Sequence, residues 1–186
     1  MKKTIAILLV LVIGMVGVWA AAPVHNTAAS MTLTTGVTGI NYIAITAEAM
    51  PSGTDTMAEF ISHASTVLAT KGITTTSSTI GHLNLLTNAR TGIAVYMKST
   101  KLSSSTSGNT ATIDLSVVCA GDTFNTASVP ETNNGYVQIL QATETAMAAG
   151  LFMSSYEITG AAEQLSFDAA PVDSYTASLT FSFVTT

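Results

Sequence analysis

The stretch from Ser174 to Val184 alternates apolar residues with hydroxyl-bearing residues. Serine or threonine separates its apolar positions, which are Tyr175, Ala177, Leu179, Phe181 and Phe183. This period of two is typical of a β-strand with one face in a core and one face in water, and no helix has it. A strand with one aromatic face is stable only when another sheet packs over that face, so the rest of the chain must supply a second layer.

Several other segments show the same alternation and predict further strands. They are 31–46, which is two short strands or one strand bent at Gly39, 81–98, 110–120, 136–141 and 151–159. The segment 81–98 predicts a hairpin that turns at 88–92, and 136–141 is predicted to pair with 151–159. Between that pair, 142–149 favours a short helical turn or a loop by composition. The fold class is therefore mainly β, an antiparallel β-sandwich.

One segment breaks the strand pattern and predicts an amphipathic helix at about residues 56–70. Its apolar residues fall on one stripe at helical spacing: Met57, Phe60, Ile61, Ala64, Val67 and Leu68. Thr56 and Glu59 have the spacing of a capping box, and Lys71 with Gly72 is a typical helix end. The polar face lacks the Lys and Arg of membrane-surface helices, so we expect the stripe to cover the open face of a sheet.

The first residues have the pattern of a secretory signal peptide. Lys2 and Lys3 precede an apolar run from Thr4 to Val18 and a cluster of small residues that ends at Ala22. We expect residues 1–20 to be a signal peptide, 21–30 to be a flexible arm and 31–186 to form a single domain. The alternative is that the apolar segment stays uncleaved and anchors the protein in a membrane. The expected location is outside the cytoplasm, at the cell surface, in the periplasm or in the medium.

The net charge of the chain limits the kinds of partner that it can bind. The chain has a net charge of -5, and removal of Lys2 and Lys3 with the signal segment leaves 4 basic and 11 acidic residues. Nucleic acid and anionic membrane surfaces both require clustered Lys and Arg, so neither is an expected partner. Charged residues make up only 9% of the sequence, whereas serine and threonine supply about a quarter of it. The surface is therefore expected to be rich in hydroxyl groups.

The sequence lacks the residue patterns of known catalytic and metal sites. Cys119 is the only cysteine, it continues an alternating strand, and it is expected to be a small core residue. The histidines, His25, His63 and His82, have no partner at zinc-binding spacing. We therefore expect no catalytic residue, no metal and no cofactor. A hydrolase with a carboxylate pair, Glu157 with Glu163 or Asp168 with Asp173, remains the enzyme alternative.

Two segments carry a resemblance to a known group of proteins. One runs Gly81-His-Leu-Asn-Leu-Leu-Thr-Asn88 and then Gly92-Ile-Ala-Val-Tyr-Met, and the other runs Asp173-Ser-Tyr-Thr-Ala-Ser-Leu-Thr-Phe181. Both are similar to exported bacterial β-sandwich proteins of the spore coat U-like and WxL-like type. Here Ile93 replaces the usual aromatic residue, and no Trp-x-Leu motif is present. The resemblance implies an Ig-like or pilin-like sandwich at the cell surface or in the periplasm, and no enzyme.

These observations predict a non-enzymatic structural protein of the bacterial cell envelope, either a coat protein or a pilus-like subunit. Its expected partners are other copies of itself or other envelope proteins, joined by an added strand for which Ala21–Thr46 is the natural donor. The alternative is a carbohydrate- or host-binding adhesin module. Such a module would stack its ligand on loop aromatics, for which the candidates are Phe124, Tyr136 and Tyr156.

Overall fold

The computed structural model describes residues 39–128, 132–142 and 150–185. All of them belong to the unit Thr38–Thr186. The predicted signal peptide, the predicted arm, residues 31–38 of the predicted strand segment 31–46 and residues 143–149 of the helical turn or loop predicted at 142–149 lie outside the described residues, so they stay predictions.

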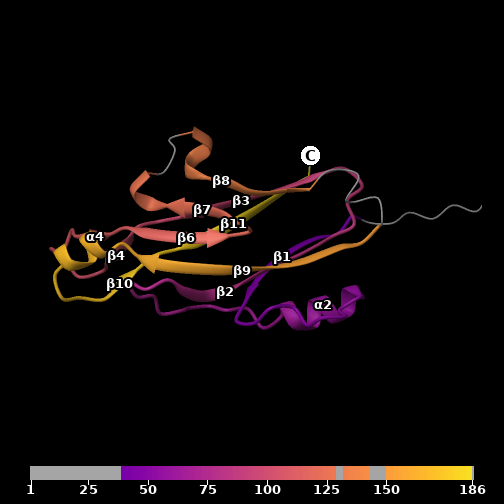
Figure 1. The fold of residues 1–186 in the computed structure, drawn as a ribbon, viewed down its shortest axis with the longest axis horizontal. Helices are drawn as coiled ribbons and strands as arrows, with labels where there is room; N and C mark the ends of the chain where they lie inside the picture. The colour runs from indigo at the N-terminus through magenta and orange to yellow at the C-terminus, as the bar shows by residue number, and fades with distance from the viewer. Residues whose placement is uncertain (1–38, 129–131, 143–149, 186) are drawn as a thin grey trace, which may run out of the picture. The chain divides into compact units, whose positions relative to one another are not determined.

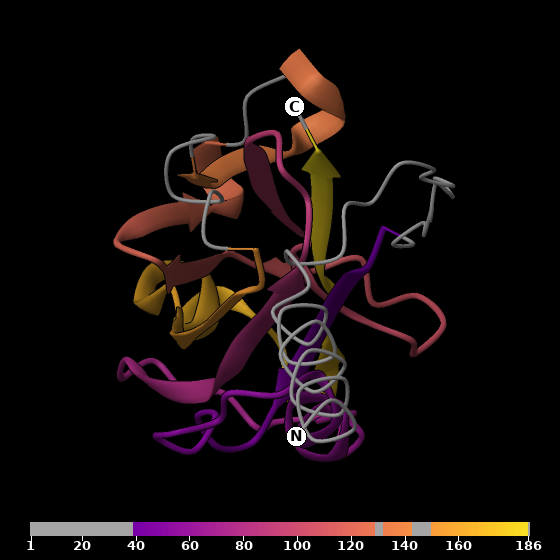
Figure 2. The ribbon, with the colours of Figure 1, turned by 90° about the vertical axis from the view of Figure 1, so that its right-hand side faces the viewer.

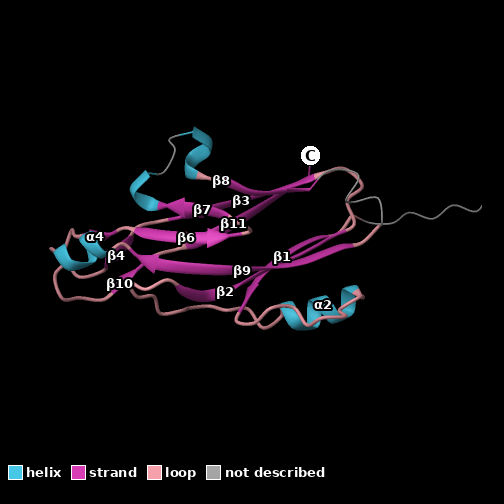
Figure 3. Cartoon of the chain, in the orientation of Figure 1, coloured by secondary structure: helices cyan, strands magenta, loops and turns pink. Residues whose placement is uncertain are grey.

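The fold is mainly β and all of its strand pairs are antiparallel, which confirms the predicted class (Figures 1 and 3). One layer is a five-stranded sheet, which contains, in spatial order, β1 (Asn41–Thr46), β2 (Ser78–Thr87), β9 (Phe152–Ala162), β6 (Leu115–Cys119) and β7 (Asp122–Asn125). The other layer contains β11 (Leu179–Thr185), β3 (Ile93–Ser99) and β8 (Val137–Ala142), with β10 (Tyr175–Thr176), β4 (Leu102–Ser104) and β5 (Thr112–Ile113) beyond them. Short 3-10 turns span Thr126–Ser128 and Thr132–Gly135.

The two groups of three strands in the second layer are joined at Thr100 and Ser178. Strand β3 leads into β4, and β10 leads into β11, so the same two chain segments run side by side in both groups. At the junction, the Thr100 backbone N–H donates to the Ser178 carbonyl at 3.0 Å. The Ser178 N–H donates in return to the Thr100 hydroxyl oxygen at 2.9 Å. The final strand predicted from the sequence is therefore present, but it is broken at this junction into β10 and β11.

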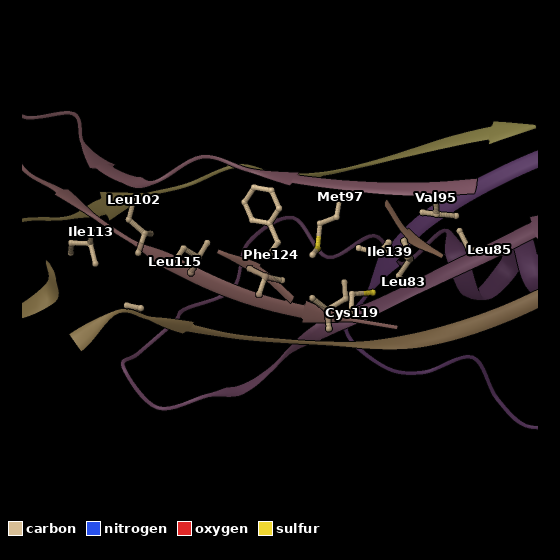
Figure 4. Close-up of a cluster of buried hydrophobic side chains, with 13 residues drawn as sticks. Leu83, Leu85, Val95, Met97, Leu102, Ile113, Leu115, Cys119, Phe124 and Ile139 are labelled. Carbon is tan, nitrogen blue, oxygen red and sulfur yellow. The ribbon is translucent and has the colours of Figure 1, made fainter. Parts of the chain in front are cut away.

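The main core lies between the layers and is formed by the inward residues of both (Figure 4). Leu83 and Leu85 of β2 and Val117 of β6 face Val95 and Met97 of β3, and all five are fully buried. Burial alternates along β6 and along β3 from Val95 onward, as expected for strands that have one face in a core. Packing of this kind between two sheets is what the aromatic face of the final strand required.

The two long sides of the sandwich differ. Strands β7 and β8 approach each other on one side, and β1 and β11 approach each other on the other side. Strands β1 and β11 are both terminal in their sheets, since each pairs with a single strand among the described residues. Figure 2 shows the domain along its length, with α2 (Met57–Ala64) at the bottom and β8 near the top.

The predicted strand pairings were wrong at two places. Strands β2 and β3 do not form a hairpin, because β2 pairs with β1 and β9 whereas β3 pairs with β11 and β8. The intervening residues cross from one layer to the other. Asn88 marks the crossing, where its side-chain Oδ1 accepts from the Ile40 N–H at 2.6 Å and its own N–H donates to the Ile40 carbonyl at 3.2 Å. Likewise, β8 pairs with β3 and not with β9.

Helix α2 begins where the sequence predicted and ends earlier. The Thr56 hydroxyl accepts from the Glu59 N–H, and the Glu59 carboxylate accepts from the Thr56 N–H, so the capping box is confirmed. The helix ends at Ala64, although the prediction extended it to about residue 70. Beyond this end, Val67 bridges to Thr46, and the Leu68 N–H donates to the Ile45 carbonyl at 2.8 Å. Backbone hydrogen bonding to the edge of β1 thus replaces the hydrogen bonds that would have continued the helix.

A second helix, α4 (Gln164–Ala169), follows β9, whereas the prediction gave only one helix. It has six residues and none of them is buried, so it carries no apolar stripe that periodicity could reveal. Two hydrogen bonds attach its start to Asp114, the residue between β5 and β6. The Glu163 N–H donates to the Asp114 carbonyl at 2.8 Å, and the Asp114 N–H donates to the Ser166 hydroxyl at 2.9 Å.

Helix α2 covers the outer face of the β1–β2–β9 side of the five-stranded sheet, as the sequence predicted for its apolar stripe. Phe60 and Ala64 are fully buried there against Ala44 and Leu86. The Phe60 and Tyr42 rings form a T-shaped pair, with centroids 5.7 Å apart and the planes at 86°. Met57 and Ile61 lie at the side of the stripe and are 39% and 40% exposed. A second, smaller core therefore holds the helix on the sheet.

Replacement of Phe60 by alanine should destabilise the domain strongly. The substitution leaves a cavity beneath α2 and removes the edge contact with Tyr42, and such changes typically cost about 3–5 kcal/mol. The matched control is Ile61→Ala on the next position of the same helix, which should cost less than about 1 kcal/mol because that side chain is largely outside the core. Urea unfolding followed by circular dichroism measures both. Equal losses for the two variants would show that α2 is not held by this core.

Candidate functional site

The three aromatic residues predicted to stack a ligand lie in three different environments. Phe124, on β7, is 1% exposed and belongs to the core between the layers (Figure 4). Its ring is therefore closed to any external ligand. Tyr156, on β9, lies opposite Leu83 and packs half-buried against the same core. Both side chains point inward because each shares a sheet face with a buried neighbour across the strand, Val117 for Phe124 and Leu83 for Tyr156.

Tyr136 lies at the surface of the second layer, immediately before β8. The ammonium group of Lys98 is 5.3 Å from the centroid of its ring, a cation–π geometry. The same ammonium donates to the Asn134 carbonyl at 2.7 Å, which ties the turn Thr132–Gly135 to β3. Of the three predicted residues, Tyr136 is thus the one that the structure places beside a polar group that a ligand could also contact.

The cysteine weighed as a reactive thiol and two of the histidines weighed as zinc ligands make structural contacts. Cys119 is fully buried, and this burial raises the pKa of its thiol to about 12. A thiol in such surroundings is protonated and unreactive. His63 Nε2 lies 3.2 Å from the Glu48 carbonyl oxygen, and His82 Nδ1 lies 3.3 Å from the Ala47 carbonyl oxygen. Both rings therefore contact the backbone that follows β1.

The carboxylates considered as an acid pair each have a separate partner. Glu157 accepts from the Thr79 hydroxyl, Glu163 from the Asn125 amide at 2.9 Å, and Asp168 from the Gln164 amide at 2.7 Å. Within the described part of the chain, no three His, Cys, Asp or Glu residues are grouped so that they could hold a metal ion.

An open sheet edge runs along β10 and β11, two of the strands that end a sheet in the described ranges. In the described ranges, β11 pairs with β3 alone and β10 pairs with β4 alone, so the other edge of both strands is open. An open edge presents N–H and C=O groups that a further strand can pair with. Sequence alternation found this strand but could not show that it is terminal in its sheet, because alternation reports faces and not neighbours.

The inward face of this edge strand is apolar and incompletely covered. Leu179, Phe181 and Phe183 of β11 pack against the main core, yet each stays partly exposed. Ile43 and Ile45 of β1, across the same side of the sandwich, are also only partly buried. An additional strand with an apolar face could therefore gain both backbone hydrogen bonds and apolar burial here.

Asp173 fixes the end of this edge. Its carboxylate accepts from the hydroxyls of Ser104 and Thr106, from the Asn109 amide at 2.8 Å and from the Ser174 N–H at 2.8 Å. These bonds tie the turn after β4 to the residue before β10. They favour the charged carboxylate, the Ser104 hydroxyl most strongly, and hold the pKa of Asp173 far below its ordinary value of 3.8.

Asp173→Asn should lower the thermal unfolding midpoint at neutral pH, because an amide cannot accept all four of these hydrogen bonds. Since the folded-state pKa of Asp173 is depressed, its contribution is complete above the ordinary value of 3.8 and is lost as the pH falls further. The gap in midpoint between wild type and variant should therefore shrink below about pH 4. Differential scanning calorimetry across pH measures this gap. Asp168→Asn is the control and should change the midpoint less, since Asp168 bonds only within α4. A gap that widens in acid would contradict the assignment.

In the ranges that the structure describes, none of the helices has the length and apolarity needed to span a membrane.

No protein-family model matches the chain, and no curated protein matches it in a sequence search.

Proposed function

We propose that the protein is a non-enzymatic, exported structural subunit of the bacterial cell envelope, a coat or pilus-like component that assembles by strand addition. The observation that carries this proposal is the open outer edge of β10–β11, with the half-exposed apolar face of β11 behind it. Such an edge is a template for a strand from another chain, and folded proteins usually cover or charge theirs. This edge strand carries no charged residue.

The composition agrees with a structural role in an exported protein. The chain is rich in Ser and Thr and poor in charge. Glu157, Glu163 and Asp168 accept structural hydrogen bonds, and the Cys119 thiol is buried in the core. The basic, apolar and small-residue pattern of residues 1–20 supports export. The resemblance of the 81–97 and 173–181 segments to exported bacterial β-sandwich proteins points the same way.

The strand that we propose to be donated lies before β1. The sequence prediction gave Ala21–Thr46 as the donor, but Asn41–Thr46 is β1 and pairs along its whole length with β2 of the same chain. We therefore assign the donor role to residues 21–38. Within them, Met31, Leu33 and Val37 alternate with Thr32, Thr34 and Thr38, which matches the need for one apolar face toward β11.

Two double variants of the protein that begins at Ala21 test the proposal. Leu33→Asp with Val37→Asp puts charge on the apolar face of the proposed donor and should abolish assembly, because buried unpaired charge is strongly unfavourable. Thr34→Asp with Thr38→Asp changes the opposite face equally and should leave assembly intact. Light scattering at increasing protein concentration, with electron microscopy of the products, measures the outcome. A wild-type protein that stays monomeric at every concentration, or equal effects of the two variants, would overturn the proposal.

A further inference from the structure

The outer face of the β8–β3–β11 sheet carries an aromatic and amide surface, of which the sequence analysis predicts only Tyr136 as a ligand contact. Val95 and Met97 of β3 point into the core, so Tyr96 and Lys98 point away from it. Tyr96 lies between Gln138 of β8 and Ser182 of β11, which are its register partners on the two neighbouring strands. Tyr96 is only partly buried and Gln138 is exposed. The phenol ring is therefore flanked by an amide and a hydroxyl at cross-strand spacing, about 5 Å.

A bulge in β8 brings a second amide to this face. The register between β3 and β8 shifts between Val95 and Tyr96, where Ile139 is the extra residue and is buried. As a result, Gln138 and Gln141 lie on the same side, and the Gln138 Nε2 donates to the Gln141 Oε1 at 3.2 Å. A β-bulge commonly redirects a side chain in this way. Each amide keeps further donor and acceptor positions for a ligand.

The charge of the face is opposite to that of the chain. Strands β3, β8 and β11 contain one charged residue, Lys98, whereas the whole chain has 11 acidic residues and a net charge of -5. The Lys98 ammonium has three N–H donors, and the one contact to the Asn134 carbonyl leaves others for an anion. The Tyr136 ring, 5.3 Å from Lys98 Nζ, holds the ammonium at the end of the face.

We propose that this face, comprising Tyr96, Lys98, Tyr136, Gln138, Gln141 and Ser182, binds an acidic polysaccharide that carries carboxylates on its sugar rings. A sugar offers an apolar C–H surface, which can stack on Tyr96, and hydroxyls that both donate to and accept from the amides and Ser182. Its carboxylate fits Lys98, the one cation of the face. Nucleic acid fits poorly because its affinity depends on several cations.

A protein partner fits this face less well than a glycan. The centre of a protein interface is usually apolar and aromatic with a polar rim, whereas here the aromatic ring is surrounded by amide and hydroxyl groups. The most exposed large apolar residues lie near α4, where Leu165 is 88% exposed and Val172 is 107% exposed, whereas the face itself carries Val184 at its end, which is 43% exposed. The proposed glycan face is also distinct from the outer edge of β11, which carries the assembly proposal.

Isothermal titration of the full chain with polygalacturonate tests the proposal, and methyl-esterified polygalacturonate is the matched probe without charge. We expect binding to the acid polymer that weakens with added salt, and at least about tenfold weaker binding to the ester. Comparable affinity for the two polymers, or no binding to the acid form, would overturn the proposal.

Variants locate the binding on this face. Tyr96→Thr and Lys98→Ala should each weaken binding to polygalacturonate by about tenfold or more, and Lys98→Arg should retain it, because the cation is kept. Lys101→Ala is the control. Lys101 lies away from this face, where its ammonium pairs with the Asp114 carboxylate at a distance of 2.7 Å, so its loss should leave the affinity unchanged. Thermal unfolding confirms that each variant is folded, and threonine at position 96 keeps strand propensity. An equal loss for Lys98→Ala and Lys101→Ala would show nonspecific attraction and refute the site.

Discussion

Burial of apolar side chains between the two layers is the interaction on which the rest of the domain depends. Leu83, Leu85, Val95, Met97 and Val117 are all fully buried there. The single cysteine is free and buried, so no disulfide supports the domain. The described ion pair, Lys101 with Asp114, is partly exposed, and such pairs contribute little to stability. The fold therefore rests on packing, and packing fixes which residues of each strand face outward.

Alternation in the sequence predicted strands well and predicted their neighbours badly. The period of two places a strand and its two faces, because it reports burial on one side. It does not report which strand lies alongside. The segments 81–87 and 93–98 illustrate this limit: each has an inward face of the right kind, so each fits a hairpin or two opposed layers equally well. Only the crossing at Asn88, where a side-chain amide binds the backbone of Ile40, decides between them.

The same limit explains why the candidate site residues were only partly predicted from the sequence. The sequence prediction treats Phe124 and Tyr156 as loop aromatics, yet each lies on a strand and faces the core. Tyr96 was predictable in principle, since it stands between Val95 and Met97 and must therefore face outward. What the sequence could not supply was its flanking by Gln138 and Ser182, because those residues come from strands 42 and 86 positions away in the chain. The end of α2 at Ala64 was hidden for a related reason, since it depends on hydrogen bonding to β1.

Strand β11 takes part in both proposed surfaces, and their geometry makes them compatible. Its open edge lies in the plane of the sheet, whereas Ser182 projects from the face, perpendicular to that plane. A donated strand would extend the sheet sideways and leave the face uncovered. Each added subunit would then present the same Tyr96 face to the outside. Repetition of a weak glycan site along an assembly raises the overall avidity without any new contact, provided that one polysaccharide chain reaches several copies. A low affinity of the single domain for a glycan would therefore be consistent with a structural subunit, because the assembly would supply the strength.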